Sequence, residues 1–374
     1  MSRSRSAEHD ARNSALKTAL GTTELARAAS QPTATTVPSR CNEIGLSWEV
    51  QDLADSHGAR IYWLGARTAP TVLLYFHGIA LSLLLWRGGF GLGAFPGHID
   101  FLDSCIKKTG NELVVALLEY GLSPTHRYPV QYNQASKALI QVMTSGYEPS
   151  SILIGGDSCG GNMALAILSS FSHSTPLIQK LELKTPLKGA LLICPWVTFS
   201  PDWESCRSSA DQDITSVSVN LDWANEYISS DDHNNYSEPV RAEVSWWKGL
   251  AVDDILVLWG ENELSRNPVQ KLSTALSDAG LNVTARECAK QVHIDCVLDA
   301  QTGMSHGEMT EHSWEWLKQK SKWNSAGWSF QQKLHQLAMA ASTAMMENES
   351  DSLSMGEEER IADQALFQAL PDSW

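Results

Sequence analysis

Five residues between two apolar runs form the clearest chemical pattern in the sequence. They read Gly156-Asp157-Ser158-Cys159-Gly160, with the apolar run Ser151–Ile154 before them and an apolar, helix-like run after them. G-x-S-x-G in this setting is typical of a serine lifted out of a sheet on a strand-to-helix turn, which is so tight that only glycine leaves room beside it. We therefore predict that Ser158 is a nucleophile whose hydroxyl lies at a helix N-terminus.

A serine hydroxyl is a poor nucleophile unless a base accepts its proton and a carboxylate orients that base. Where this motif occurs, the three groups follow one another in the order serine, acid, histidine. His293 follows a predicted last strand, Ala285–Cys288, and is the candidate base. Three carboxylates near an earlier apolar run compete for the role of the acid: Asp254, Glu261 and Glu263.

The remaining requirement is a set of backbone N–H groups that hold the negative charge of the reaction intermediate. Cys159, directly after the serine, is expected to supply one. The others should come from a glycine loop after an early strand, but residues 79–87 separate Gly78 from Gly88 and Gly89. Without that segment the sequence would read His-Gly-Gly-Gly, so we hypothesise an insertion from an alternative gene model or splice form. If the protein contains it, Gly78 and Gly88 need not be neighbours and the oxyanion hole could be misformed.

The elements that must position these residues follow from the alternation of short apolar runs with helical patterns after about residue 60. The predicted strands are Arg60–Leu64, Thr71–Phe76, Leu113–Leu118, Ser151–Ile154, Ala190–Cys194 and Ile255–Trp259. Each run is apolar on both faces, which is typical of a buried parallel sheet. Helical patterns such as Gln134–Thr144 and Val269–Ala279 lie between the runs. The sequence therefore predicts an α/β protein with a doubly wound, mostly parallel sheet.

The composition is that of a soluble globular protein, with 43% apolar and 19% charged residues. A formal charge of −15 argues against nucleic acid or an anionic membrane as a partner and favours a small-molecule substrate. We expect a cytoplasmic protein without a membrane span, because no apolar run reaches about 20 residues and the first residues lack the apolar core of a secretory signal. The seven cysteines form no CxxC pair and the histidines show no metal-ligand spacing, so we expect neither a metal nor a cofactor. The oligomeric state is left open.

The sequence contains, in this order, HG…GGF, EYGLSPTHRYP, GDSCGGN and the later acid and histidine. With this combination the chain resembles the hormone-sensitive-lipase group of α/β-hydrolases. The resemblance covers roughly residues 60–320 and is greatest to fungal esterase-like members, some of which act in secondary metabolism. It implies that Ser158 is the nucleophile, His293 the base and Glu263 the acid. In the family the acid lies three residues after the small residue that ends the preceding strand, and that small residue is Gly260 here. The family usually has Asp there, so Glu is a departure. The glycines of the family's oxyanion loop fall on Gly78, Gly88 and Gly89.

The resemblance implies an enzyme that hydrolyses carboxylic esters of small apolar molecules through an acyl-enzyme. A different class of function is a ligand-binding protein on the same scaffold, as in plant gibberellin receptors that lack the catalytic histidine. His293 favours the enzyme, whereas the interrupted glycine loop favours the binding protein. Acyl transfer or peptide hydrolysis would use the same three side chains.

Three segments lie outside the strand–helix alternation. Residues 201–247 are rich in acidic and aromatic residues, and form either a helical cap over a pocket or a connecting excursion. A helical pattern at Ala15–Ala29 lies near the N-terminus and another at Gln331–Met346 near the C-terminus. The predicted organisation is an N-terminal arm or part of the cap over 1–45, an α/β-hydrolase catalytic domain over 46–322, ending in a helix at Glu308–Lys320, and an acidic extension over 323–374.

Overall fold

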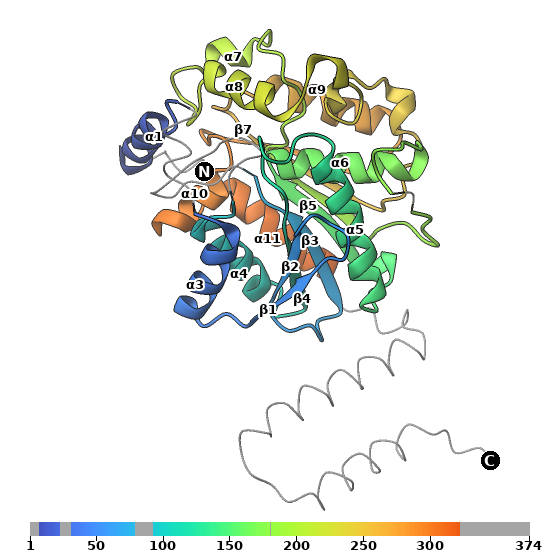
Figure 1. Cartoon of the computed structure of the whole chain (residues 1–374). Helices are drawn as coiled ribbons and strands as arrows, with labels where there is room; N and C mark the ends of the chain where they lie inside the picture. The colour runs from blue at the N-terminus through green and yellow to red at the C-terminus, as the bar shows by residue number, and fades with distance from the viewer. Residues whose placement is uncertain (1–6, 23–30, 79–92, 180, 322–374) are drawn as a thin grey trace, which may run out of the picture. The chain divides into compact units, whose positions relative to one another are not determined.

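A computed structural model describes residues 7–22, 31–78, 93–179 and 181–321 (Figure 1). The chain divides into two compact units, residues 1–323 and 324–374, and the described residues all belong to the first. Gly88, Gly89 and the hypothesised insertion at 79–87 lie outside the described residues, as does the helical pattern predicted at Gln331–Met346.

Eight strands form one sheet in the order β1-β2-β4-β3-β5-β6-β7-β8. Their bounds are β1 Trp48–Asp52, β2 Arg60–Leu64, β3 Thr71–Phe76, β4 Leu113–Glu119, β5 Ile152–Asp157, β6 Gly189–Ile193, β7 Ile255–Gly260 and β8 Val283–Cys288. All pairings from β4 to β8 are parallel, and every residue of β3, β5, β6 and β7 is buried. The predicted fold class, a doubly wound and mostly parallel sheet, is confirmed.

The parallel direction predicted for one strand, β2, is wrong. The run Arg60–Leu64 is a strand, as predicted, but β2 pairs antiparallel with both β1 and β4. Its apolar residues are buried on both faces because the sheet is covered on both sides there as well. Burial on both faces therefore identified the strand but not its orientation. The edge strand β1 was not predicted, since its residues are half-buried or exposed.

Helices flank the sheet in two groups (Figure 1). In the first group α4 packs against α3, α10 and α11, and in the second α5 packs against α6. The bounds are α3 Thr33–Ile44, α4 Pro96–Lys108, α5 Val130–Thr144, α6 Cys159–Ser172, α9 Arg266–Asp278, α10 Asp295–Thr302 and α11 Glu308–Ser321. The helices α6 and α10 matter most for the site, because each begins within two residues of a predicted site residue.

Between β6 and β7 the chain forms α7 Ser205–Ser208, α8 Val217–Tyr227 and three short 3₁₀ turns at Ser230–Asp232, Pro239–Arg241 and Val244–Trp247. This segment is anchored by large side chains that are fully buried, among them Trp223, Tyr227 and Trp247. Because burial of one aromatic side chain contributes about 2 kcal/mol, these anchors hold an otherwise irregular stretch in place.

The N-terminal helix α1 spans Ala7–Ala19, which begins and ends earlier than the predicted pattern at Ala15–Ala29. It ends where Gly21 closes a turn onto Thr18, and glycine is unfavourable inside a helix by about 1 kcal/mol. The earlier start brings Arg12 onto α10, where its guanidinium bonds with Asp295 and Asp299. No helix among the described residues has the length and apolar character needed to cross a membrane.

Candidate active site

Ser158 lies on the turn between β5 and α6, as the sequence predicts. Its backbone has φ 51° and ψ −119°, a combination that non-glycine residues rarely adopt and that is found at functional sites. The N–H of Ser158 donates to the carbonyl of Ile193 at 2.9 Å, which ties the turn to β6. A Cβ atom at Gly156 or Gly160 would overlap the carbonyl oxygen of Phe76, so both positions require glycine.

His293 reaches Ser158 from the loop between β8 and α10. Its Nε2 lies 2.9 Å from Ser158 Oγ, within hydrogen-bonding distance. Its other ring nitrogen, Nδ1, faces Glu263 Oε2 at 3.6 Å, an ion-pair distance that is long for a hydrogen bond. Such contacts are often long without substrate and tighten during reaction. The imidazole of His293 therefore lies between Ser158 and Glu263, with one ring nitrogen facing each side chain.

The structure separates the three candidate acids. Glu263 is fully buried just after β7, and its second oxygen accepts a hydrogen bond from Ser265 Oγ at 2.7 Å. Glu261 points to the N–H of Lys290, 2.7 Å away. Asp254 lies at the opposite end of β7, where it contacts α11. Among these carboxylates only Glu263 is in contact with His293.

The charges around His293 favour its protonated form. Burial alone lowers the pKa of the imidazole, but the negative charges of Glu263, Asp213 and Asp157 outweigh it and raise the pKa above the ordinary value. An imidazole of raised pKa is a stronger base for the serine proton, and it must be neutral to accept that proton. The site is therefore suited to general-base chemistry and should lose it as the pH falls through the pKa of His293.

Two of the predicted oxyanion-hole residues, Gly78 and Cys159, lie beside Ser158. A Cβ atom at Gly78 would lie 2.7 Å from Ser158 Cβ, so this glycine is directly beside the serine. Cys159 is the first residue of α6, and the N–H groups of the first turn of a helix have no partner within the helix. Gly88 and Gly89 cannot be compared with the prediction, because they lie outside the described residues.

A buried polar network supports the turn from below. The carboxylate of Asp157 is fully buried and accepts hydrogen bonds from Tyr75 Oη at 2.9 Å and from His98 Nε2 at 3.3 Å. Burial alone would raise the pKa of Asp157, yet His98 and Tyr75 lower it below its ordinary value. Asp157 therefore remains ionised, and its hydrogen bonds fix the position of the chain just before Ser158.

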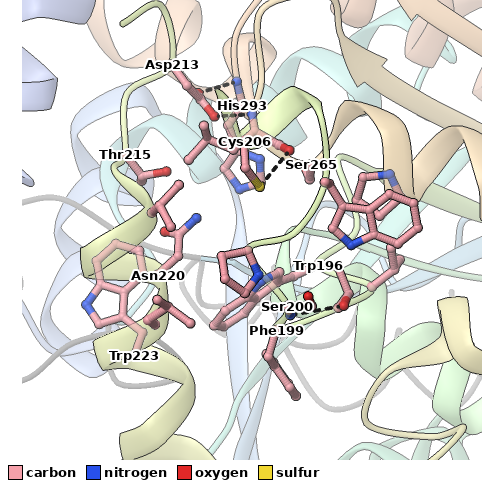
Figure 2. A pocket seen from close by; sticks show the side chains of 18 of the residues that line it. Trp196, Phe199, Ser200, Cys206, Asp213, Thr215, Asn220, Trp223, Ser265 and His293 are labelled. Carbon is pink, nitrogen blue, oxygen red and sulfur yellow. Dashed lines mark hydrogen bonds between the residues drawn. The ribbon is translucent and has the colours of Figure 1, made fainter. Parts of the chain in front are cut away.

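A pocket opens over Ser158 and His293, and Figure 2 shows the side chains that line it. The cavity has a volume of about 50 Å³. Four aromatic side chains line it, from the loop after β6 and from α8: Trp196, Phe199, Trp203 and Trp223. The segment 201–247 thus forms one side of the pocket, and the apolar lining favours an apolar ligand.

One group of side chains among the described residues has the proximity of a metal site. Donor atoms of Cys194, Glu263 and His293 lie within 4.8 Å of one another. The ring nitrogen of His293 that faces Glu263 is Nδ1, at 3.6 Å, and the sulfur of Cys194 accepts the N–H of Ile294 at 3.3 Å. A metal bound there would replace the contact between Glu263 and His293, so the arrangement fits orientation of the imidazole better than metal binding.

Sequence reasoning missed one buried carboxylate at this site. Asp213 comes from the segment between α7 and α8, lines the pocket and accepts a hydrogen bond from the main-chain N–H of His293 at 3.2 Å. The sequence offers only the acidic character of the surrounding stretch as a signal, which is common to many surface segments. No spacing within the sequence links Asp213 to His293.

The comparisons with known proteins agree with the fold. A family model described as alpha/beta hydrolase fold matches residues 73–296, which is more than half of the chain, so the chain belongs to this family. The chain is 27% identical to an esterase of Acinetobacter venetianus, over 44% of this chain and 48% of the esterase. It is 30% identical to arylacetamide deacetylase-like 2 of Homo sapiens, over 34% of this chain and 31% of that protein.

The chain spans less than half the length of these two relatives. A solved structure of an esterase from the bacterial hormone-sensitive lipase family superposes with a TM-score of 0.64 at 20% identity, over 85% of this chain and 100% of that structure. At this identity the likeness concerns the fold.

Proposed function

We propose that this protein is a carboxylic ester hydrolase that acts through an acyl-enzyme, with Ser158 as nucleophile, His293 as general base and Glu263 as the carboxylate that orients His293. The observation that carries the proposal is the 2.9 Å contact between Ser158 Oγ and His293 Nε2, with Glu263 on the opposite ring nitrogen. This is the arrangement that nucleophilic catalysis by serine requires. The names of the two curated relatives, an esterase and a deacetylase-like protein, support it.

The reaction follows from the positions of these groups. His293 Nε2 accepts the Ser158 proton while Oγ attacks the ester carbonyl, and N–H groups at Cys159 and in the glycine loop that begins at Gly78 hold the resulting oxyanion. The protonated imidazole then gives its proton to the departing alcohol, which leaves the acyl group on Ser158. Water attacks this acyl-enzyme, again with His293 as base, and releases the acid.

A small apolar ester suits the pocket best. The free volume of the pocket, about 50 Å³, is roughly a third of the 150 Å³ cavity that accepts benzene in other proteins, so the pocket favours a short acyl group.

A ligand-binding protein without activity is the alternative, and the contact of His293 with Ser158 argues against it. Acyl transfer and peptide hydrolysis would use the same three side chains. Membership of a fungal esterase-like group, a role in secondary metabolism and a cytoplasmic location stay predictions.

Replacement of Ser158 by alanine tests the proposal. Turnover of p-nitrophenyl acetate by Ser158→Ala should fall by about 10⁴-fold or more, because the nucleophile is lost while the fold needs no serine hydroxyl there. Ser151→Ala is the matched control, since this half-buried serine lies just before β5, at the end of the strand opposite Ser158. Turnover that persists in Ser158→Ala at the level of Ser151→Ala would refute the assignment.

A further inference from the structure

Asp213 holds three separate parts of the site with one carboxylate. Its Oδ1 accepts the N–H groups of Ile214 at 2.8 Å and His293 at 3.2 Å, and its Oδ2 accepts the N–H of Leu264 at 2.8 Å. Leu264 directly follows Glu263, so the loops that carry the proposed acid and the proposed base are both bonded to the same side chain. Figure 2 shows Asp213 beside His293 at the edge of the pocket.

The bonds of Asp213 reach across the fold. Leu264 lies 51 residues and His293 80 residues away in the sequence. A carboxylate that accepts several main-chain N–H groups fixes the loops that donate them, and such charge-assisted bonds are stronger than bonds between neutral groups. Asp213 is only 2% exposed, so water competes little for these bonds.

Asp213 also adds a negative charge near the imidazole of His293. The groups that face His293 are Glu263 at Nδ1, Asp213 at the main chain and Asp157 below the turn. On its other side Asp213 borders a cavity of about 430 Å³ whose charged side chains are Asp10, Lys17, Asp211 and Lys290. Burial raises the pKa of Asp213 to about 6, so the carboxylate is mostly ionised at neutral pH.

We propose that Asp213 is a positioning residue of the active site: it fixes the loops of Glu263 and His293 and, as an anion, increases the basicity of His293. The segment between β6 and β7 thus contributes to the chemistry as well as to the pocket wall. This inference rests on the proposed roles of Ser158, His293 and Glu263. It does not require Asp213 to touch the substrate.

The sign of the pH effect follows from the charge. An anion near His293 favours the imidazolium, so its removal lowers the pKa of His293 and extends activity to lower pH. At the same time the near-isosteric Asp213→Asn keeps one acceptor oxygen and places an NH₂ group against a main-chain N–H. The loops of the site lose part of their anchoring, and the maximal rate falls. A residue needed only for stability would lower the amount of folded protein without moving the pH profile.

The experiment measures the second-order rate of Ser158 modification by a small fluorophosphonate between pH 4 and pH 9. We expect Asp213→Asn to lower the plateau rate by about tenfold or more and to move the acid limb down by about 0.5 pH unit or more. Because the rate constant is measured on molecules that react, a fraction that is permanently misfolded lowers the amplitude and leaves the rate constant unchanged. A plateau and an acid limb that match the unchanged protein would overturn the proposal.

Two further variants sharpen the result. Asp211→Asn removes the same charge two residues away from an exposed position, and should leave both the plateau and the acid limb unchanged. Asp213→Glu keeps the anion but displaces it by one methylene, so it should lower the plateau while the acid limb stays in place. Should Asp213→Asn fail to fold, a full plateau rate in Asp213→Glu would contradict the proposal. Modification that persists in Ser158→Ala would instead refute the proposed nucleophile, so the two failures are distinct.

Discussion

The turn at Ser158 and the segment between β6 and β7 meet over the same pocket but are built in opposite ways. The turn is short, and the neighbouring backbone restricts which residues fit in it, since any side chain at Gly160 would overlap the carbonyl of Phe76. The segment between β6 and β7 is long and irregular, and buried side chains such as Asp213 and Trp223 tie it to distant loops. Local backbone sterics therefore fix the nucleophile, whereas long-range contacts shape the pocket.

The largest expected effect is at the turn itself. Gly160→Ala introduces a methyl group against the Phe76 carbonyl, so β5 and α6 must shift and move Ser158 relative to His293. A displacement of about 1 Å costs roughly a hundredfold in rate, and we expect at least that loss in kcat/KM for p-nitrophenyl acetate.

Gly280→Ala is the control for this change. Gly280 has φ +84° with open space around it, so alanine there costs about 1–2 kcal/mol in stability through backbone strain alone. Its kcat/KM should equal that of the unchanged protein. Equal activity in Gly160→Ala would contradict the view that sterics at the turn fix the nucleophile.

The next effect concerns the interrupted glycine loop. Deletion of residues 79–87 would join Gly78 to Gly88 and create the uninterrupted His-Gly-Gly-Gly sequence. Since one oxyanion donor contributes about 10²-fold or more to the rate, we expect kcat to rise by about tenfold or more if the interruption misforms the hole. The two forms are compared by steady-state kinetics on p-nitrophenyl acetate, and equal activity would show that the interruption is harmless.

The smallest effect should come from the pocket wall. Trp203→Ala enlarges the pocket without touching Ser158 or His293, so the ratio of kcat/KM for an octanoate ester to that for acetate should rise by about tenfold. Trp48→Ala, on the edge strand β1, controls for the loss of a half-buried tryptophan. A uniform loss on both esters in Trp203→Ala would indicate that this wall affects the chemistry and would weaken the comparison.

The same contrast explains how far the sequence could predict this molecule. The strands β3, β5, β6 and β7 were predictable because burial on both faces leaves continuous apolar runs, and Ser158 because its neighbours must be glycine. The direction of β2 was not predictable from the sequence, since antiparallel and parallel strands in a covered sheet have the same apolar pattern.

From the sequence, only a family resemblance favours Glu263 over Glu261, because the local sequence around the two residues is nearly the same. They differ in where their side chains point, Glu263 to His293 and Glu261 to Lys290. Asp213 could not be predicted at all. Its bonds to Leu264 and His293 exist only once three loops converge, and a short acidic stretch gives no sign of them.

The role of Ser158 as nucleophile is tested most directly by finding which residue reacts. A fluorophosphonate probe is incubated with the full chain, and the modified residue is mapped by mass spectrometry. We predict a single modification at Ser158, which disappears in His293→Ala because the serine then lacks the base 2.9 Å from its oxygen. Absence of labelling in the unchanged protein, or a label on another residue that persists in His293→Ala, would contradict it.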